Sequence, residues 1–371
     1  QTGVHSAGVI IADKPVSEYA PLLWNDEKNC WVIESDMVEC EKTLGLLKMD
    51  FLGLENLDIL NLALKYIKTT KKVAVHFHDI NKADDPNVIR DIYACGRTNG
   101  VFQFESDGIK KALTGFNPTS IDDVILMNAA YRPGPMDSIP EITEVKNGTE
   151  KPNYIIPQME QILGKTYGSA IYQEQIMQLF QLVGFSLGEA DVIRRAMSKK
   201  HLDEIEAAKD KFVSGMIEQG GKPADVEKFW IRLLAFASYA FNKSHAAAYS
   251  IVSYYTAFLK YYFPCEYLSA QLSYTPEKLK LFLSDLKYAG LTLLQPDINS
   301  GVPNFAPMPG NNKQIRFGIK AIKGVSAAAQ IIYDLRDTKK SNPNAHHLGP
   351  CKDYKDFIVR SIVYGVDMGV C

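Results

Sequence analysis

The chain has 371 residues, of which 46% are hydrophobic and 23% charged, and its formal net charge is −2. This length suits roughly two or three domains with a sizeable core, and the small net charge means that a polyanion must be met by local basic patches. No apolar run reaches the roughly 18 residues of a membrane span, and residues 1–12 lack the features of a signal peptide. Because it starts at Gln1 and stops at Cys371 in a segment that still looks structured, we interpret the chain as an internal fragment.

Several common catalytic and metal-binding motifs are absent. The six cysteines form no C-x-x-C pair, and scattered cysteines in a large chain suit a reducing compartment, which predicts a cytoplasmic protein. G-x-G-x-x-G, G-x-S-x-G and H-E-x-x-H do not occur. The run Gly164-Lys-Thr166 fails as a phosphate-binding P-loop, because Met159 stands where the first glycine is needed.

The first 55 residues read as short strands. Apolar and polar side chains alternate over residues 3–35, with β-rich runs at Val9–Ile11 and Cys30–Ile33. Leu46–Leu52 predicts one more strand, which Gly53 ends. After about residue 55 the strand signals mostly fade.

Helical periodicity dominates the rest of the chain. Residues 296–312, rich in Pro, Gly and Asn, predict a connector, and Gln314–Ile319 predicts a return to a short strand. The predicted fold class is therefore mainly α with a small α+β N-terminal piece. Helices are expected at 54–67, 85–95, 106–115, 118–130, 155–163, 171–183, 187–200, 202–219, 223–239, 245–262, 266–273 and 276–289.

Several of these helices have recognisable start signals. Ser186-Leu-Gly-Glu189 fits the capping box, in which a serine and a glutamate satisfy each other's backbone N–H groups. Asn117-Pro118 and Asp84-Asp-Pro86 place a cap residue and a proline where helices commonly begin. Asn242 or Ser244 is expected to cap the long helix that Pro264 terminates.

The helix over 187–200 gathers cations. Ala190, Ile193 and Met197 recur at the spacing of one buried helix face. Like charges four residues apart repel one another, so a helix that collects them favours binding of an anion, with phosphate the commonest candidate. A solvated basic face is the alternative. The cations are Arg194, Arg195, Lys199 and Lys200.

Lys48 and Asp50 form a second candidate site. Residues two apart on a strand point to the same face, so the two side chains project together beside a glycine turn. The carboxylate suits a metal ion and the lysine a phosphate, although a surface ion pair is the simpler interpretation. Asp50 is the one plausible metal carboxylate, so a two-metal site would be incomplete.

Three further runs carry polar groups at predicted turns or helix starts. The prolines of Tyr131–Met136 would hold Arg132 in a fixed pose, for binding an anion or for a structural turn. Tyr172, Gln173 and Gln175 suit contacts to bases or sugars, or a polar groove between helices. Ala240–Tyr249 would join free backbone N–H groups to Lys243 and His245 as an anion site, unless the histidine has only a structural partner.

The order of these motifs resembles the catalytic alpha subunits of bacterial DNA polymerase III, the C family of replicative polymerases, in the form without an inserted exonuclease domain. The resemblance extends from residue 1 to about 336. It rests on seven ordered runs: Gly3–Ile11, Lys48–Leu54, Gly100–Ser106, Tyr131–Met136, Tyr172–Gln175, Arg194–Met197 and Phe241–Tyr249.

This resemblance implies a domain layout and roles for individual residues. Residues 1–55 would be the end of a nucleotidyltransferase-type palm, and 56–371 a helical fingers domain with a connector near 296–312 and a truncated helical end at 318–371. Asp50 would be one of three metal-binding aspartates and Lys48 a catalytic lysine near the nucleotide phosphates. The residues implied to bind the nucleotide or to lie near it are Arg194, Arg195, Lys199, Lys200, Lys243, His245, Arg132 and Gln173.

The implied reaction is template-directed transfer from a deoxynucleoside triphosphate (dNTP) to a primer 3′-hydroxyl, with Mg²⁺ as cofactor and primer–template DNA as partner. The clamp and clamp loader would bind through regions outside this chain, and no membrane would be involved. The chain alone is expected to be inactive. A non-catalytic helical nucleic-acid-binding module is the alternative, and an unrelated phosphotransferase a weaker one.

Overall fold

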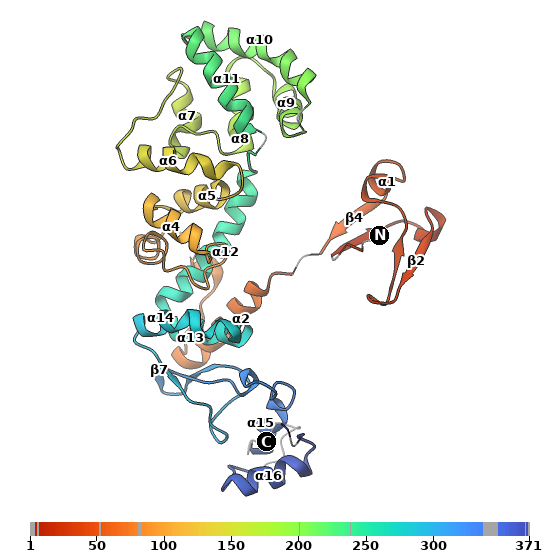
Figure 1. Cartoon of the computed structure of the whole chain (residues 1–371), viewed down its shortest axis with the longest axis vertical. Helices are drawn as coiled ribbons and strands as arrows, with labels where there is room; N and C mark the ends of the chain where they lie inside the picture. Colours follow the sequence, from red (N-terminus) through yellow and green to blue (C-terminus); the bar gives the residue numbers. More distant parts are fainter. Residues whose placement is uncertain are drawn as a thin grey trace. The chain divides into compact units, whose positions relative to one another are not determined.

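The computed structural model describes residues 4–5, 7–51, 53–80, 84–199, 201–237, 239–336, 348–367 and 369. The chain divides into two compact units, Gln1–Asp58 (unit 1) and Ile59–Cys371 (unit 2), whose elements are labelled in Figure 1. No helix among the described residues is both long and apolar enough to cross a bilayer.

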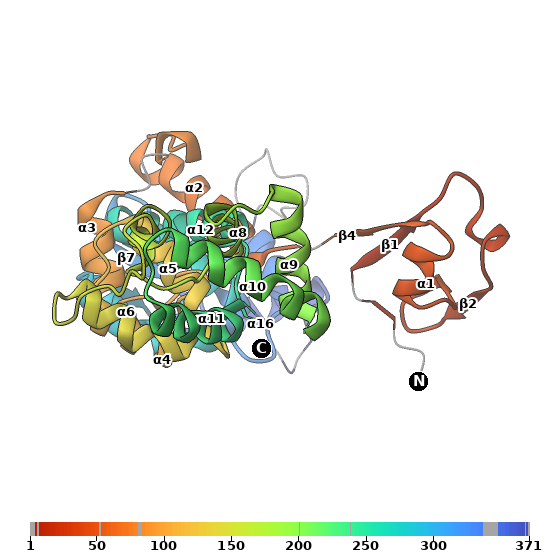
Figure 2. The same cartoon turned by 90° about the horizontal axis from the view of Figure 1, so that it is seen from above.

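Unit 1 contains two small antiparallel strand pairs and one helix. β1 (Gly8–Ile11) pairs with β4 (Leu47–Asp50), and β2 (Leu22–Asn25) pairs with β3 (Cys30–Ile33). The Asp36 side chain caps α1 (Met37–Lys42), which packs against β4 and lies beside it in Figure 2. A short 3-10 turn, η1, covers Val16–Glu18. The strands predicted around residues 9, 30 and 48 are confirmed.

Unit 2 is mainly helical, as the sequence predicted. Helix α2 (Glu55–Lys71) begins at the end of unit 1 and continues into unit 2. The other longer helices are α4 (Asp107–Phe116), α5 (Ile121–Ala130), α8 (Gln173–Leu182), α9 (Leu187–Lys199), α10 (Leu202–Glu218), α11 (Pro223–Ala237), α12 (Lys243–Tyr262), α13 (Pro264–Tyr274), α14 (Leu279–Tyr288) and α16 (Tyr354–Val363). The shorter ones are α3 (Pro86–Val88), α6 (Ile139–Lys146), α7 (Met159–Leu163) and α15 (Ala329–Arg336). Between them lie the π-helical η3 (Ile89–Ala94) and the 3-10 turns η2 (Phe77–Ile80), η4 (Pro135–Ser138), η5 (Gly164–Thr166), η6 (Pro276–Lys278) and η7 (Ile319–Ala321).

Several hydrophobic cores hold these helices together. One core packs α4 and α5 against the first half of α12, and another packs α7, α8, α9, α10 and α11 together. A third lies between α13, α14 and a small sheet, and a fourth joins α2 to the end of α12 and to α13. Because α12 contributes to more than one core, it links the helices around α5 to those around α13 (Figure 1).

Several local features differ from the predictions. Residues 296–312 are not purely a connector, because β6 (Ala306–Met308) and the start of β7 (Asn311–Arg316) lie there and pair with each other. β7 overlaps the strand predicted at Gln314–Ile319, and it also pairs in parallel with β5 (Thr292–Leu294), which was not predicted. Asn117 ends α4 with φ 55° rather than starting a helix, and Ser120 caps α5 instead. Helix α6 was not predicted.

Candidate functional site

The capping box at the start of α9 is confirmed. The Ser186 N–H donates to Glu189 Oε2 at 2.7 Å, and the Glu189 N–H donates to Ser186 Oγ at 3.3 Å. These bonds, with Lys211, lower the pKa of Glu189 from 4.5 to about 2. The predicted apolar face is also confirmed, since Ala190, Ile193 and Met197 are buried in the core. The capping box and the buried face together fix the rotation of α9 about its axis, and hence the direction in which its cations point.

Arg194 and Arg195 share one carboxylate on this helix. Arg194 Nη2 lies 2.8 Å from Asp191 Oδ1, and Arg195 Nη2 lies 3.0 Å from Asp191 Oδ2. The hydrogen bond from Arg194 is the main reason that the pKa of Asp191 is lowered. Two guanidinium groups against one carboxylate leave a positive balance, and Arg195 is 58% exposed. Lys199 is the last residue of α9, and Lys200 lies outside the described residues.

Gln173 connects this basic helix to the segment that precedes α12. Arg194 Nη1 donates to Gln173 Oε1 at 3.2 Å, and Gln173 Nε2 donates to the Ala240 carbonyl at 3.1 Å. The backbone N–H of Gln173 also donates to the Phe241 carbonyl at 3.0 Å, and Tyr172 and Phe241 form a parallel β-bridge. Two segments almost 70 residues apart in the sequence therefore lie side by side, and the structure brings Gln173 and Arg194 together.

The start of α12 has one of the two predicted cap residues, but its backbone N–H groups are not all free. Asn242 caps the helix, its Oδ1 accepting from the His245 N–H at 2.8 Å. Both oxygens of Glu174 accept from the Lys243 N–H at 3.1 Å. A carboxylate thus already occupies the helix start, where free N–H groups were expected to bind an anion, and it would repel a second anion. The Lys243 ammonium lies 5.4 Å from the Tyr172 ring centroid.

Arg132 and His245 line one pocket of about 300 Å³. The Arg132 guanidinium stacks on the Phe241 ring, and burial lowers its pKa, although an arginine remains charged at neutral pH. The His245 ring stacks on Tyr249, with centroids 4.4 Å apart, and its edge meets Phe241. The remaining lining residues are Gln103, Ile109, Asn128 and Tyr131.

The turn that holds Arg132 is built as the sequence predicted. Gly134 has φ 102°, a conformation that favours glycine, and a Cβ there would lie 2.6 Å from the Tyr239 ring. The 3-10 turn η4 follows directly. Because the Phe241 ring packs against Arg132 while the Phe241 carbonyl accepts from Gln173, the pocket adjoins the Gln173–Arg194 contact.

Two residues considered for nucleic-acid contact are structural instead. Tyr172 is buried, and Gln175 is 5% exposed. The Gln175 Oε1 accepts from the N–H groups of Ile171 and Tyr172, and its Nε2 donates to Thr166 Oγ1. Gln175 therefore serves the start of α8 and is not available to a ligand.

In unit 1, Lys48 and Asp50 project from β4 together, as the two-residue period predicted. Lys48 Nζ donates to Asp50 Oδ1 at 2.6 Å, and His5 Nδ1 lies 3.7 Å from the same oxygen. The hydrogen bond from Lys48 lowers the pKa of Asp50, whose side chain is 42% exposed. Gly8 lies opposite Asp50, and a Cβ at Gly8 would approach all three side chains within about 3 Å.

An ionised, exposed carboxylate oxygen is a suitable ligand for a hard divalent cation. Asp50 therefore fits the role of one metal ligand. No group of three His, Cys, Asp or Glu side chains gathers as a metal site within the part of the chain that the structure describes. The prediction that Asp50 alone makes an incomplete metal site stays a prediction.

Comparison with known families decides where the chain belongs. Residues 1–53 match the family model of the bacterial DNA polymerase III alpha NTPase domain, and residues 56–220 match that of the bacterial DNA polymerase III alpha subunit finger domain. The DNA polymerase III subunit alpha of Aquifex aeolicus is 41% identical over 345 residues, 91% of this chain and 29% of that protein. This chain belongs to the bacterial DNA polymerase III alpha subunit family.

Other DNA polymerase III alpha subunits give the same picture. The protein of Thermus aquaticus is 39% identical over 367 residues, covering 96% of this chain and 29% of that protein. That of Halalkalibacterium halodurans is 35% identical over 366 residues, covering 98% and 32%. The chain thus spans about 30% of the length of these polymerase III alpha relatives.

The sequence analysis did not predict two residues of this site. Glu174 was passed over although it follows Gln173, because its partner at the start of α12 is distant in the sequence. Gln103 lies in the quoted run Gly100–Ser106 but carried no motif that assigned it a role. The signal that singles out Gln103 is a positive φ of 68°, which only the structure reveals.

Proposed function

We propose that this chain supplies the end of the palm, residues 1–55, and the fingers, residues 56–371, of a bacterial replicative DNA polymerase. The complete enzyme would join a dNTP to a primer 3′-hydroxyl under the direction of a template. Its setting would be the cytoplasm, and its partners primer–template DNA and, through regions outside this chain, the clamp and clamp loader. Family membership supports this proposal.

The observation that carries it is the continuous path from α9 to the pocket. Arg195 and Arg194 share Asp191, Arg194 contacts Gln173, and Gln173 adjoins Phe241, against which Arg132 and His245 pack. One planar guanidinium group can donate two parallel hydrogen bonds to two oxygens of a phosphate. A triphosphate at Arg194 and Arg195 would have its charge neutralised by groups that the core and the capping box already hold in place, so that little reorganisation accompanies the reaction.

In the palm, Asp50 would bind Mg²⁺ as one ligand among several, and Lys48 would keep the carboxylate ionised. When bound, the ion would activate the attacking hydroxyl and stabilise the leaving pyrophosphate. The neighbouring lysine would lie near the nucleotide phosphates. Because Asp50 is the single metal carboxylate assigned in this chain, we expect the chain alone not to extend a primer.

The test is dNTP binding by the chain, measured at moderate salt with and without the paired substitutions Arg194→Ala and Arg195→Ala. We expect the double variant to bind at least tenfold more weakly, because each charge-assisted hydrogen bond contributes roughly 1.5–3 kcal/mol. Arg90→Ala is the control matched to Arg195, since Arg90 is likewise exposed and pairs with a neighbouring aspartate at 2.8 Å.

Equal binding by the wild-type chain and the double variant would contradict the assignment. A non-catalytic nucleic-acid-binding helix is the other candidate, favoured by the exposure of Arg195 on α9. That alternative predicts DNA binding that weakens steeply with salt and is indifferent to dNTP. The polymerase proposal predicts that dNTP with Mg²⁺ competes.

A further inference from the structure

Gln103 occupies a backbone conformation that is rare for its residue type. The Phe104 N–H donates to the Val101 carbonyl at 3.0 Å and closes a four-residue turn. Gln103 is the third residue of that turn, with φ 68°, where glycine is the usual choice. A strained non-glycine residue persists only where the surrounding structure enforces it, and such residues cluster at functional sites.

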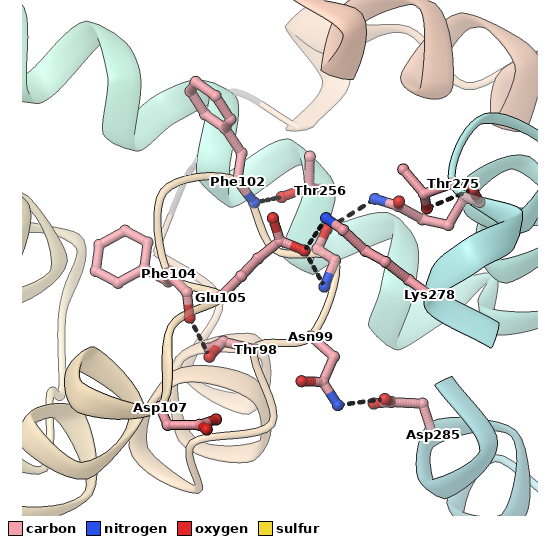
Figure 3. A network of polar contacts seen from close by, with 12 residues as sticks. Thr98, Asn99, Phe102, Phe104, Glu105, Asp107, Thr256, Thr275, Lys278 and Asp285 are labelled. Atoms are coloured by element: carbon pink, nitrogen blue, oxygen red, sulfur yellow. Dashed lines mark hydrogen bonds and ion pairs between the residues drawn. The ribbon is translucent and has the colours of Figure 1, made fainter. Parts of the chain in front are cut away.

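The surrounding structure enforces this turn from both sides (Figure 3). The Phe102 N–H donates to Thr256 Oγ1 of α12 at 3.1 Å, and Thr98 Oγ1 donates to the Phe104 carbonyl at 2.5 Å. Phe102 and Phe104 are both buried. The residues directly before and after Gln103 are therefore anchored in the protein, and the turn holds Gln103 out from it.

The base of the same loop is fixed by charged and polar groups. Asn99 Nδ2 donates to Asp285 Oδ2 at 2.8 Å, and Lys278 Nζ lies 3.6 Å from Glu105 (Figure 3). Gly100 has φ 69°, and a Cβ there would press on Gln271 and Phe282 at 3.1 Å. The loop is thus a rigid support whose tip is Gln103.

The Gln103 side chain is exposed and lines the pocket that contains Arg132 and His245. Its amide makes no hydrogen bond to any of the described residues, whereas the other amide of the pocket, Asn128, donates to Ser250 Oγ at 3.0 Å. Phe102 stacks on Tyr249, with centroids 5.6 Å apart, so the turn is joined to the aromatic wall of the pocket. Gln103 is therefore the amide that remains available to a ligand there.

We propose that Gln103 is a specificity-determining contact to the nucleoside part of the nucleotide, an assignment that rests on the proposed function. A carboxamide donates and accepts hydrogen bonds without carrying charge, which suits the edge of a base or a sugar hydroxyl. Aromatic walls suit the flat face of a base. The phosphates have their own partners in Arg194 and Arg195, so the two ends of one nucleotide are recognised by separate groups.

The experiment compares two probes, a dNTP and inorganic tripolyphosphate, on the wild-type chain and on Gln103→Gly. Glycine adopts the positive φ without strain, so this variant keeps the turn and removes only the amide. We expect dNTP to bind about threefold to tenfold more weakly, the effect of one neutral hydrogen bond, and tripolyphosphate to bind unchanged. The midpoint of thermal unfolding should not fall. Asn29→Gly, at another non-glycine residue with positive φ (51°), is the matched control.

The outcomes distinguish failure of this inference from failure of the proposed function. Loss of binding to both probes in the Arg194→Ala and Arg195→Ala variant, with Gln103→Gly unchanged for both, would overturn the inference and leave the proposed function standing. Failure of the wild-type chain to bind either probe would overturn both. Equal loss for all four dNTPs in Gln103→Gly supports a sugar contact, and unequal loss supports a contact to the base.

Discussion

Two lysine–aspartate ion pairs, one in each unit, have nearly the same N···O distance but differ in their exposure to solvent. Lys48 and Asp50 lie 2.6 Å apart, with the aspartate 42% exposed. Lys260 and Asp285 lie 2.5 Å apart, with both side chains less than one-tenth exposed. Lys260 also donates to the carbonyls of Arg97 and Asn99 at 2.8 and 2.7 Å. The buried pair therefore has its hydrogen-bonding capacity filled by protein.

The difference teaches that environment, rather than distance, separates a structural ion pair from a candidate ligand site. Burial lowers the pKa of Lys260 although Asp285 opposes the shift, so its charge is held at a cost that only the complete set of partners offsets. These partners of Lys260, which are Asp285 and the carbonyls of Arg97 and Asn99, also fix the base of the loop that carries Gln103. Asp50 keeps an ionised carboxylate open to solvent, as a metal ligand must be before the ion arrives.

The largest expected effect is that of Asp50→Asn in a full-length polymerase that contains these residues. Primer extension should fall by at least about 100-fold, the scale for loss of one preorganised charge-stabilising group, while DNA binding measured by fluorescence anisotropy survives. The thermal midpoint of unfolding should not change, because the side chain is exposed. Asp26→Asn, an exposed aspartate of the same unit, is the control. Extension at a near-normal rate would refute the assignment of Asp50 as a metal ligand.

The next largest effect is expected on stability. Lys260→Met leaves Asp285 buried without its cation, so the free energy of unfolding of unit 2 should fall by about 3–5 kcal/mol. Denaturant unfolding of the chain measures this loss. Lys48→Met serves as the counterpart in the pair whose aspartate is 42% exposed, where we expect a loss below about 1 kcal/mol. The double variant Lys260→Met with Asp285→Leu should lose less than the sum of the single variants. An additive result would show that the two residues are not coupled.

The sequence predicted most of the helices because their apolar spacing and caps are local. Ser186 with Glu189 and Asn242 with His245 are bonds within one turn, and both were found. The sheet of β5, β6 and β7 was largely missed, since two of its strands have only three residues and Pro307 interrupts the strand signal. Helix α6 was missed because Pro140 lies in its first turn and resembles a break.

The site was predicted less completely because its geometry depends on contacts between distant segments. The period of two placed Lys48 beside Asp50, and the helical period placed Arg194 and Arg195 opposite a buried face. No local pattern shows that the Glu174 carboxylate occupies the start of α12, or that Gln103 lies beside Arg132 and His245. Those juxtapositions follow from the packing of α8 and of the 98–104 loop against the segment around α12.

The smallest expected effect concerns Glu189, which is exposed like Asp50 but has a structural role. The pKa of Glu189 is about 2 in the folded chain, against 4.5 ordinarily, because its carboxylate accepts hydrogen bonds at the start of α9. A lowered pKa in the folded state gives stability that is complete above pH 4.5 and is lost as the pH falls toward 2. The wild-type chain should therefore exceed Glu189→Gln in thermal midpoint near neutral pH, and the gap should close between pH 4.5 and 2. Glu218→Gln, an exposed glutamate at the end of α10, is the control. A gap that stays constant across this range would show that the charge of Glu189 does not hold the start of α9, and that Arg194 and Arg195 are oriented by the buried face alone.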